Sequence, residues 1–203
     1  MHGRSRYPLI VMGEEIKVDS PLAGRHQLRN LALAITTAEE LAQFGFKVTP
    51  KQVEQGIRET HWPGRFQVLP PSPASHQREI ALDVAHNPAG AWALRSALSE
   101  TFPGRELTLV FAAMRDKAVQ EMAEILFPIA EQVILTKVAN PRAATTSELL
   151  QAGSRTGTAL YEEQTVTAAL QRAREVSRPQ GIVVLTGSIF LVGEAMMVMG
   201  IPA

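Results

Sequence analysis

Four candidate sites in the sequence carry side chains of the types that can bind nucleotides or anions. The first is Asp83-Val84-Ala85-His86-Asn87-Pro88, in which an acid, an imidazole and an amide follow an apolar run. A carboxylate at the end of a strand can accept hydrogen bonds from ribose hydroxyls, and a histidine ring can pack against a base. The competing interpretation is that Asp83 and Asn87 only cap the helix that follows.

Two further segments contain residues suited to phosphate. Gly24 to Asn30 opens a predicted helix with polar side chains, and His26 and Asn30 share one helix face because they are four residues apart. A helix N-terminus attracts phosphate, although the same residues also suit a solvated helix start. In Trp62-Pro63-Gly64-Arg65 a stiff turn carries a guanidinium that can bind phosphate through two hydrogen bonds, or can lie on the surface beside the tryptophan.

The fourth candidate combines Asp116-Lys117 with Thr186-Gly187-Ser188, since both follow predicted strands and should open onto one edge of a sheet. Ser188 also suits a helix cap. The chain has no G-x-x-x-x-G-K-[ST] loop and no G-x-G-x-x-G after a strand, so it lacks the usual glycine-rich phosphate cradle. It has no cysteine, and its remaining histidines share no ligand spacing, so no metal site is expected within it.

The elements that must position these residues lie mostly after Trp62. Short apolar strands there alternate with helices of about ten residues, which predicts right-handed crossovers and a mostly parallel, Rossmann-like α/β sheet. The expected strands are Phe66–Leu69, Glu79–Val84, Leu107–Ala112, Gln132–Leu135, Ala159–Tyr161 and Ile182–Leu185. The expected helices are Ala89–Glu100, Ala118–Phe127, Ser147–Gly153, Thr165–Val176 and Ile189–Val198.

Residues 1–62 follow a different pattern. A weak alternation predicts a hairpin of Pro8–Met12 and Glu15–Val18, followed by an amphipathic helix over Gly24–Gln43. Thr49-Pro50-Lys51-Gln52 is typical of a capped helix start, and this second helix should run to about Thr60. The turn at 61–65 marks the predicted domain boundary, and a second Pro/Ser cluster follows at Pro70–Ser75.

Composition excludes several classes of protein. Lys plus Arg and Asp plus Glu both number 20, so the zero net charge lacks the footprint of a general nucleic-acid binder. The apolar stretch Gly181–Ala203 approaches the roughly 20 residues of a membrane span. Its β-branched start and the turn at 186–188 favour a buried strand and helix instead, and no membrane association is expected. The absence of cysteine fits a reducing cytoplasm.

Taken together, the motifs resemble the folylpolyglutamate synthase/dihydrofolate synthase family of the Mur ligase superfamily. The matching segments occur in the family's order: Gly24-x-His26-Gln27-x-x-Asn30, Trp62-Pro63-Gly64-Arg65-Phe66, Asp83-x-Ala85-His86-Asn87-Pro88, Asp116-Lys117, Asn140-Pro141-Arg142-Ala143 and Thr186-Gly187-Ser188-x-x-x-Val192-Gly193-Glu194. The resemblance covers only the second half of such an enzyme. It implies that residues 1–62 are a mostly helical remnant of the central ATPase domain and that residues 63–203 are the Mur ligase carboxy-terminal domain.

The resemblance implies ATP-dependent amide formation between L-glutamate and a folate or dihydropteroate carboxylate, through an acyl phosphate. Asn30 and Arg65 would approach the ATP phosphates, Asp83 the ribose, and His86 and Asn87 the adenosine. Ser188, with help from Lys117, would lie near the incoming glutamate. The P-loop and the Mg²⁺ ligands would belong to the missing half, so this chain alone should be inactive. A monomeric, cytoplasmic enzyme is implied.

Two other functions stay open on the sequence. One is a stand-alone α/β module that binds adenosine without catalysis, and the other is a Mur ligase of peptidoglycan synthesis. The Asp83-x-Ala85-His86-Asn87-Pro88 motif favours the folate branch of the superfamily over the peptidoglycan branch. The sequence does not separate dihydrofolate synthase from folylpolyglutamate synthase, because the discriminating pocket would lie upstream. It also leaves open whether Met1 is a native start or the boundary of a fragment.

Overall fold

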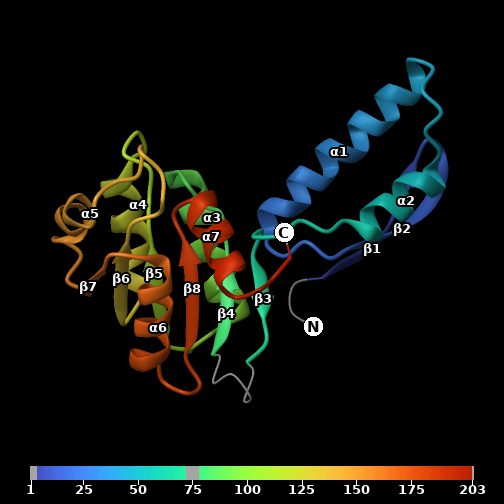
Figure 1. The fold of residues 1–203 in the computed structure, drawn as a ribbon. Helices are drawn as coiled ribbons and strands as arrows, with labels where there is room; N and C mark the ends of the chain where they lie inside the picture. Colours follow the sequence, from blue (N-terminus) through green and yellow to red (C-terminus); the bar gives the residue numbers. More distant parts are fainter. Residues whose placement is uncertain (1–3, 72–77, 203) are drawn as a thin grey trace. The chain divides into compact units, whose positions relative to one another are not determined.

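A computed structural model describes residues 4–71 and 78–202 (Figure 1). Contacts divide the chain into two compact units, Met1–Trp62 and Pro63–Ala203, each of which is described by itself. Most of the Pro/Ser cluster predicted at 70–75 lies outside the described residues.

The first unit is a hairpin with two helices. Its strands β1 (Ser5–Val11) and β2 (Glu14–Ser20) pair antiparallel, and its helices are α1 (Arg25–Gln43) and α2 (Pro50–Glu59). The hairpin loop is Met12-Gly13, both with positive φ, as a tight two-residue turn requires. Thr49 and Gln52 form the expected capping box on α2. The predicted hairpin and both helices are therefore confirmed, with strands longer than expected.

The small core of this unit lies between the hairpin and the helices. Its buried apolar side chains come from β1, β2, α1 and α2, namely Val11, Ile16, Val18, Leu31, Ile35 and Ile57. Large apolar side chains on α1 and in the loop after it nevertheless remain exposed: Leu28, Leu33, Leu41, Phe44 and Phe46.

The second unit is built on a six-stranded sheet in the order β3-β4-β8-β5-β6-β7. The strands are β3 (Gln67–Leu69), β4 (Glu79–Leu82), β5 (Leu107–Phe111), β6 (Gln132–Thr136), β7 (Ala159–Glu163) and β8 (Ile182–Thr186). All neighbours are parallel except β3, which runs antiparallel to β4 at the edge. The predicted mostly parallel sheet is confirmed.

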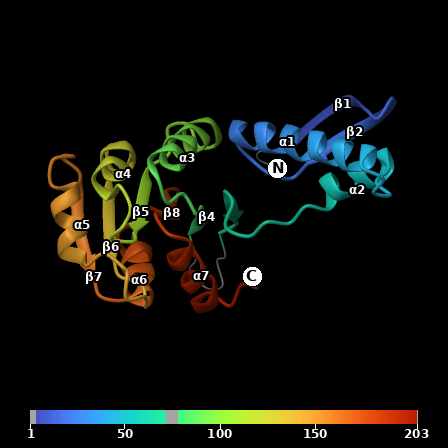
Figure 2. The ribbon, with the colours of Figure 1, turned by 90° about the horizontal axis from the view of Figure 1, so that it is seen from above.

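Helices cover both faces of this sheet. They are α3 (Pro88–Thr101), α4 (Val119–Leu126), α5 (Thr146–Gly153), α6 (Val166–Val176) and α7 (Ile189–Val198), with a short 3-10 turn, η2 (Phe127–Ile129), after α4. Figure 2 shows α3, α4 and α5 along one face and α6 and α7 along the other. Because α6 returns the chain over the opposite face, β8 enters between β4 and β5.

This insertion creates the point where ligands bind in such sheets. The strands β4 and β5 are followed by helices on one face, whereas β8 between them is followed by a helix on the other. The connections after these three strands therefore diverge, and in open parallel sheets ligands bind outside the carboxyl ends of strands arranged in this way.

The apolar stretch from Gly181 onward folds as predicted from its internal signals. Its residues form the fully buried β8 and then α7, which packs against α6. Within the residues that the structure describes, no helix is both long enough and apolar enough to cross a membrane.

Candidate functional site

Backbone hydrogen bonds join the loops at the carboxyl ends of β4, β8, β5 and β6 into one rim. Gly187 N–H of the β8 loop donates to the Ala85 carbonyl of the β4 loop at 3.0 Å. On the other side, the Ala112 N–H donates to the Thr186 carbonyl at 3.4 Å, and the Ala144 N–H donates to the Ala113 carbonyl at 2.9 Å. The predicted site residues that follow these strands are thus carried on a continuous, fixed edge.

Asp83 is buried at this rim and holds two backbone amides. Its Oδ1 accepts from the Ala85 N–H at 2.8 Å, and its Oδ2 accepts from the Phe66 N–H at 2.9 Å. Burial raises the pKa of the Asp83 carboxyl to about 6, and these two N–H donors, Arg65 and His86 offset the burial only in part. Asp83 does not cap α3, because that role belongs to Asn87.

Arg65 lies on a turn between two residues with left-handed backbone. Gly64 has φ 71° and Phe66 has φ 48°. The Gly64 carbonyl accepts from the Val84 N–H at 2.9 Å, which explains why β4 ends at Leu82 and not at the predicted Val84. Phe66 belongs to this turn and not to the strand that was predicted to begin with it.

The β4 loop orients His86 and Asn87 differently. The His86 ring nitrogen Nδ1 lies 2.9 Å from the Val84 carbonyl oxygen. Since a carbonyl oxygen only accepts, Nδ1 carries the proton, and in the neutral ring Nε2 is left as an acceptor on an exposed side chain. Asn87 caps α3 by accepting from the Gly90 N–H at 2.8 Å. The capping interpretation is therefore right for Asn87, whose amide nitrogen remains a donor.

Ser188 begins α7 inside the same rim. Its Oγ accepts from the Phe190 N–H at 3.1 Å, which makes it the helix cap, and the residue is only 2% exposed. Its hydroxyl proton is not used by that bond. Gly187 before it has φ 104°, and a Cβ there would collide with the Ala112 carbonyl oxygen. Only glycine lets the β8 loop approach β5 this closely.

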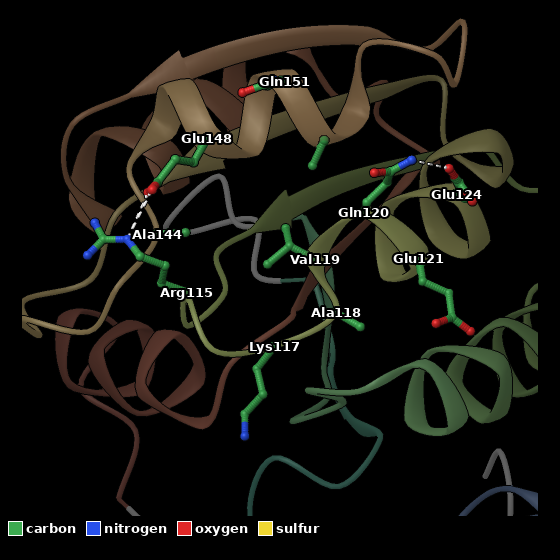
Figure 3. A pocket seen from close by; sticks show the side chains of 11 residues that line it. Arg115, Lys117, Ala118, Val119, Gln120, Glu121, Glu124, Ala144, Glu148 and Gln151 are labelled. Atoms are coloured by element: carbon green, nitrogen blue, oxygen red, sulfur yellow. Dashed lines mark hydrogen bonds and ion pairs between the residues drawn. The ribbon is translucent and has the colours of Figure 1, made fainter.

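Lys117 follows β5 and borders a groove of 620 Å³ between α4 and α5. In Figure 3 its side chain points away from the Arg115–Glu148 ion pair, and its Nζ lies 3.2 Å from Asp116 Oδ2. The backbone N–H of Thr145 and the side chain of Arg115 hold the pKa of Glu148 below its usual value. The groove contains no other predicted site residue.

Asn30 belongs to the first unit, on the exposed side of α1. Its amide donates to Gln27 Oε1 at 3.2 Å, and Gln27 in turn contacts the His26 ring at 3.0 Å. Gly24 precedes the helix with φ 97° and gives it no side-chain cap. The polar start of α1 is thus an ordered cluster of side chains around a buried glutamine.

Within residues 4–71 and 78–202, no three His, Cys, Asp or Glu side chains are grouped so that they could hold a metal ion. The two acids of the predicted site motifs, Asp83 and Asp116, are engaged by backbone amides and by Lys117 respectively.

The structure brings Arg65, Asp83, His86, Asn87 and Ser188 to one rim, whereas Lys117, in the segment after β5, borders the groove between α4 and α5. Two contributors carry no signal in the sequence, namely the backbone amides of Phe66 and Ala85. Gly187 belongs to the predicted Thr186-Gly187-Ser188 motif, but its close packing is visible only in the structure. Pro63-Gly64 signals a turn, but nothing in the residue type of Phe66 indicates a positive φ.

Comparison with known proteins shows the family of the part of the chain that carries this rim. Residues 64–189 match the family described as Mur ligase, glutamate ligase domain. The chain is 34% identical over 179 residues to the folylpolyglutamate synthase of Lacticaseibacillus casei, covering 86% of this chain and 38% of that protein. It is 33% identical over 183 residues to a probable bifunctional folylpolyglutamate synthase/dihydropteroate synthase of Haloferax volcanii, covering 90% and 21%.

Solved structures agree with the sequence matches. The folylpolyglutamate synthase of Mycobacterium tuberculosis complexed with ADP superposes with a TM-score of 0.78 at 27% identity, covering 97% of this chain and 47% of that one. The chain thus spans less than half the length of these relatives. Because the matched residues 64–189 are more than half of this chain, it belongs to the Mur ligase, glutamate ligase domain family.

Proposed function

We propose that the chain is the carboxy-terminal part of an ATP-dependent ligase that joins L-glutamate to a folate or dihydropteroate carboxylate. The observation that supports this most is the rim itself, since it gathers a guanidinium, an imidazole, an amide and a capping serine within the part that matches the glutamate ligase domain. The named relatives are folylpolyglutamate or dihydrofolate synthases. The proposal includes a monomeric enzyme in the cytoplasm, where ATP and glutamate are available.

On this proposal the nucleotide occupies the β4 side of the rim. Arg65 contacts the phosphates, because its fixed turn presents a guanidinium that suits paired phosphate oxygens. His86 and the free amide nitrogen of Asn87 face the adenosine. Asp83 accepts from the ribose with lone pairs left over from its two amide contacts, since a carboxylate has about four acceptor positions. Asn30, in the polar start of α1, is a further candidate for phosphate binding.

Glutamate is assigned to the β8 and β5 side. The Ser188 hydroxyl proton and the Lys117 ammonium can both donate to a carboxylate. The α7 N-terminus beneath Ser188 adds partial positive charge. These are the groups that an amino-acid substrate with two carboxylates requires.

The proposed reaction has two steps. A carboxylate oxygen of the folate substrate attacks the γ-phosphorus of ATP and releases ADP, which leaves an acyl phosphate. The glutamate amine then attacks the acyl carbon, loses a proton and expels inorganic phosphate through a tetrahedral intermediate. Arg65 and Asn30 stabilise phosphate charge, while Ser188 and Lys117 orient the amine substrate. Catalysis of this kind depends on positioning and electrostatics, so no protein nucleophile is needed.

ATP chemistry of this class uses a divalent cation, and a related folylpolyglutamate synthase/dihydrofolate synthase from Yersinia pestis is complexed with AMPPNP and a manganese ion. The described residues of this chain offer no cluster for such an ion. Mg²⁺ ligands and the P-loop would therefore be contributed by sequence beyond these 203 residues, and the chain alone should have neither ligase nor ATPase activity.

The test joins the chain to the amino-terminal half of the Lacticaseibacillus casei relative. The hybrid is incubated with ATP, Mg²⁺, glutamate and either dihydropteroate or tetrahydrofolate, and mass spectrometry measures addition of one glutamate. Product formation that is lost in Arg65→Ala supports the proposal. ADP binding by the chain without product in the hybrid would favour an adenosine-binding module. Amide formation only with a peptidoglycan precursor would favour the peptidoglycan ligases.

A further inference from the structure

The backbone around Arg65 is held in a conformation that a phenylalanine does not adopt unaided. Gly64 and Phe66, on either side of Arg65, both have positive φ. Glycine adopts this conformation readily, but a side chain is disfavoured there by contact between Cβ and the backbone. Some other interaction must therefore keep Phe66 in place.

Four contacts fix this turn. The Phe66 N–H donates to Asp83 Oδ2 at 2.9 Å, and the Phe66 ring is buried with its centroid 6.2 Å from that of Phe102. The Gly64 carbonyl accepts from the Val84 N–H at 2.9 Å. Gly64 itself packs so closely that a Cβ there would lie 2.9 Å from Val192 Cγ1. Two of these contacts act directly on Phe66, the packing of its ring against Phe102 and the hydrogen bond from its N–H to Asp83. Of these two, only the hydrogen bond holds the backbone of Phe66.

The same carboxylate also holds the loop that carries His86. Asp83 Oδ1 accepts from the Ala85 N–H at 2.8 Å, one residue before His86. The two oxygens of one buried side chain thus join the Arg65 turn to the His86 loop across 17 residues of sequence. Moving this side chain changes both segments together.

We infer that Asp83 is a positioning residue, whose carboxylate sets the direction of Arg65 and its separation from His86 by holding the amides of Phe66 and Ala85. This inference rests on the proposed function, in which Arg65 binds phosphate, and it gives Asp83 a role in addition to the ribose contact. A residue that acts through Arg65 affects any polyphosphate ligand, whereas a ribose contact affects only nucleosides and nucleotides.

The first experiment needs no ligand. Amide hydrogen exchange measured by NMR on the unaltered chain should show Phe66 protected like Val84 and Ala85, because all three N–H groups have acceptors within this cluster. In Asp83→Asn, Phe66 should lose at least about tenfold of that protection, and Arg65 Nε–Hε should show faster motion. Rapid Phe66 exchange in the unaltered chain, or an unchanged Arg65 signal in a folded variant, would overturn the inference.

The second experiment separates positioning from ribose binding. Calorimetry measures the affinity of the chain for ADP and for inorganic tripolyphosphate, which has no ribose. Arg65→Ala and Asp83→Asn should each weaken tripolyphosphate binding by about tenfold, and the double variant should be no weaker than Arg65→Ala alone. If Asp83→Asn weakens ADP binding but leaves tripolyphosphate binding unchanged, Asp83 acts only through the ribose contact and the positioning role is wrong.

The two experiments also distinguish the inference from the proposed function. If the unaltered chain binds neither ADP nor tripolyphosphate, the assignment of a nucleotide to this chain's rim fails. The exchange and Arg65 dynamics measurements still decide whether Asp83 controls the turn. Asn87→Ser serves as a matched control for the exchange and tripolyphosphate measurements only, because it alters the same loop while keeping a capping oxygen and leaves the Asp83 contacts in place.

Discussion

At the scale of single residues, the buried carboxyl group of Asp83 has a proposed role in ligand binding and also affects folding stability. It is only 7% exposed, and burial raises its pKa to about 6 although two backbone amides, Arg65 and His86 favour the charged form. Keeping a buried carboxylate ionised at neutral pH costs folding free energy, which the hydrogen bonds recover only in part. The protein therefore retains this charge at some cost to stability.

Because this cost depends on the ionisation of Asp83, the unfolding free energy depends on pH, in a direction set by the raised pKa of Asp83. The pKa of an aspartate in an unfolded chain is 3.8 and that of Asp83 in the folded protein is about 6, so the folded state binds more protons between these values. Stability from this group is fully present below pH 3.8 and is lost as the pH rises through 6. Relative to Asp83→Asn, the unaltered chain should lose about 2 kcal/mol of unfolding free energy between about pH 4.5 and 7.5.

Urea unfolding followed by circular dichroism at a series of pH values measures that difference, and the variant removes the contribution of other titrating groups. Parallel pH profiles for the two proteins would show that the pKa of Asp83 is not raised.

Asn87 allows a second test, because its cap and its proposed adenosine contact can be separated. Asn87→Ala should destabilise the chain by about 1 kcal/mol through loss of the bond to the Gly90 N–H. Asn87→Ser should keep most of the cap but lose the amide nitrogen, so ADP affinity should fall by about 2- to 10-fold at nearly unchanged stability. ADP affinity is measured by calorimetry. If it is unaltered in Asn87→Ser, Asn87 only caps α3 and makes no adenosine contact.

Residue type and position after a strand are visible in the sequence, and they pointed to Asp83, His86, Asn87 and Ser188. Of the other predicted site residues, Arg65 lies on a turn before β3, Lys117 borders a separate groove and Asn30 lies in the first unit. The sequence did not show how Asp83 is used. That use depends on the positive φ of Phe66 and on a contact across 17 residues, and neither is encoded in a local pattern. Competing capping interpretations of Asp83 and Asn87 were resolved only by the bond from Gly90.

At the scale of elements, alternation and burial predicted the strands and helices, but not the order of the strands. The run Ile182–Thr186 is apolar throughout most of its length, as expected for a central parallel strand, yet no local signal places β8 between β4 and β5. That placement comes from the return of α6 over the opposite face. The position of β8 next to β5 also brings the backbone at Gly187 close to Phe111 and Ala112.

Gly187 and Gly193 form a matched pair for testing that approach. Gly187→Ala must place a Cβ against a backbone carbonyl and the Phe111 ring at φ 104°, so it should destabilise the chain by about 2–4 kcal/mol. Gly193 lies in α7 with open space around it, so Gly193→Ala should be neutral or stabilise by up to about 1 kcal/mol. Urea unfolding of both variants compares them. Equal effects would mean that the β8 loop relaxes away from β5.

At the scale of the whole molecule, the two units differ in how completely they bury their apolar residues. The second unit encloses a sheet with helices on both faces and a continuous core on the α6 and α7 side. Among its described residues, the first unit has one core cluster of six buried apolar side chains, and it leaves large apolar side chains of α1 and the following loop in solvent. A groove of 470 Å³ between α1 and α2, lined mainly by apolar residues, adds to this open surface.

This difference predicts unequal protection from amide hydrogen exchange. Opening α1 or α2 exposes little additional apolar surface, so their amides should exchange through low-cost local openings, whereas β5 and β8 should exchange only on global unfolding of their unit. Mass spectrometry on peptides from 25–59 and from 107–111 and 182–186 makes the comparison. Equal protection would mean that the apolar surface of α1 is covered, by the second unit or by another copy of the chain. A concentration series separates these cases, because only protection by another copy should fall on dilution.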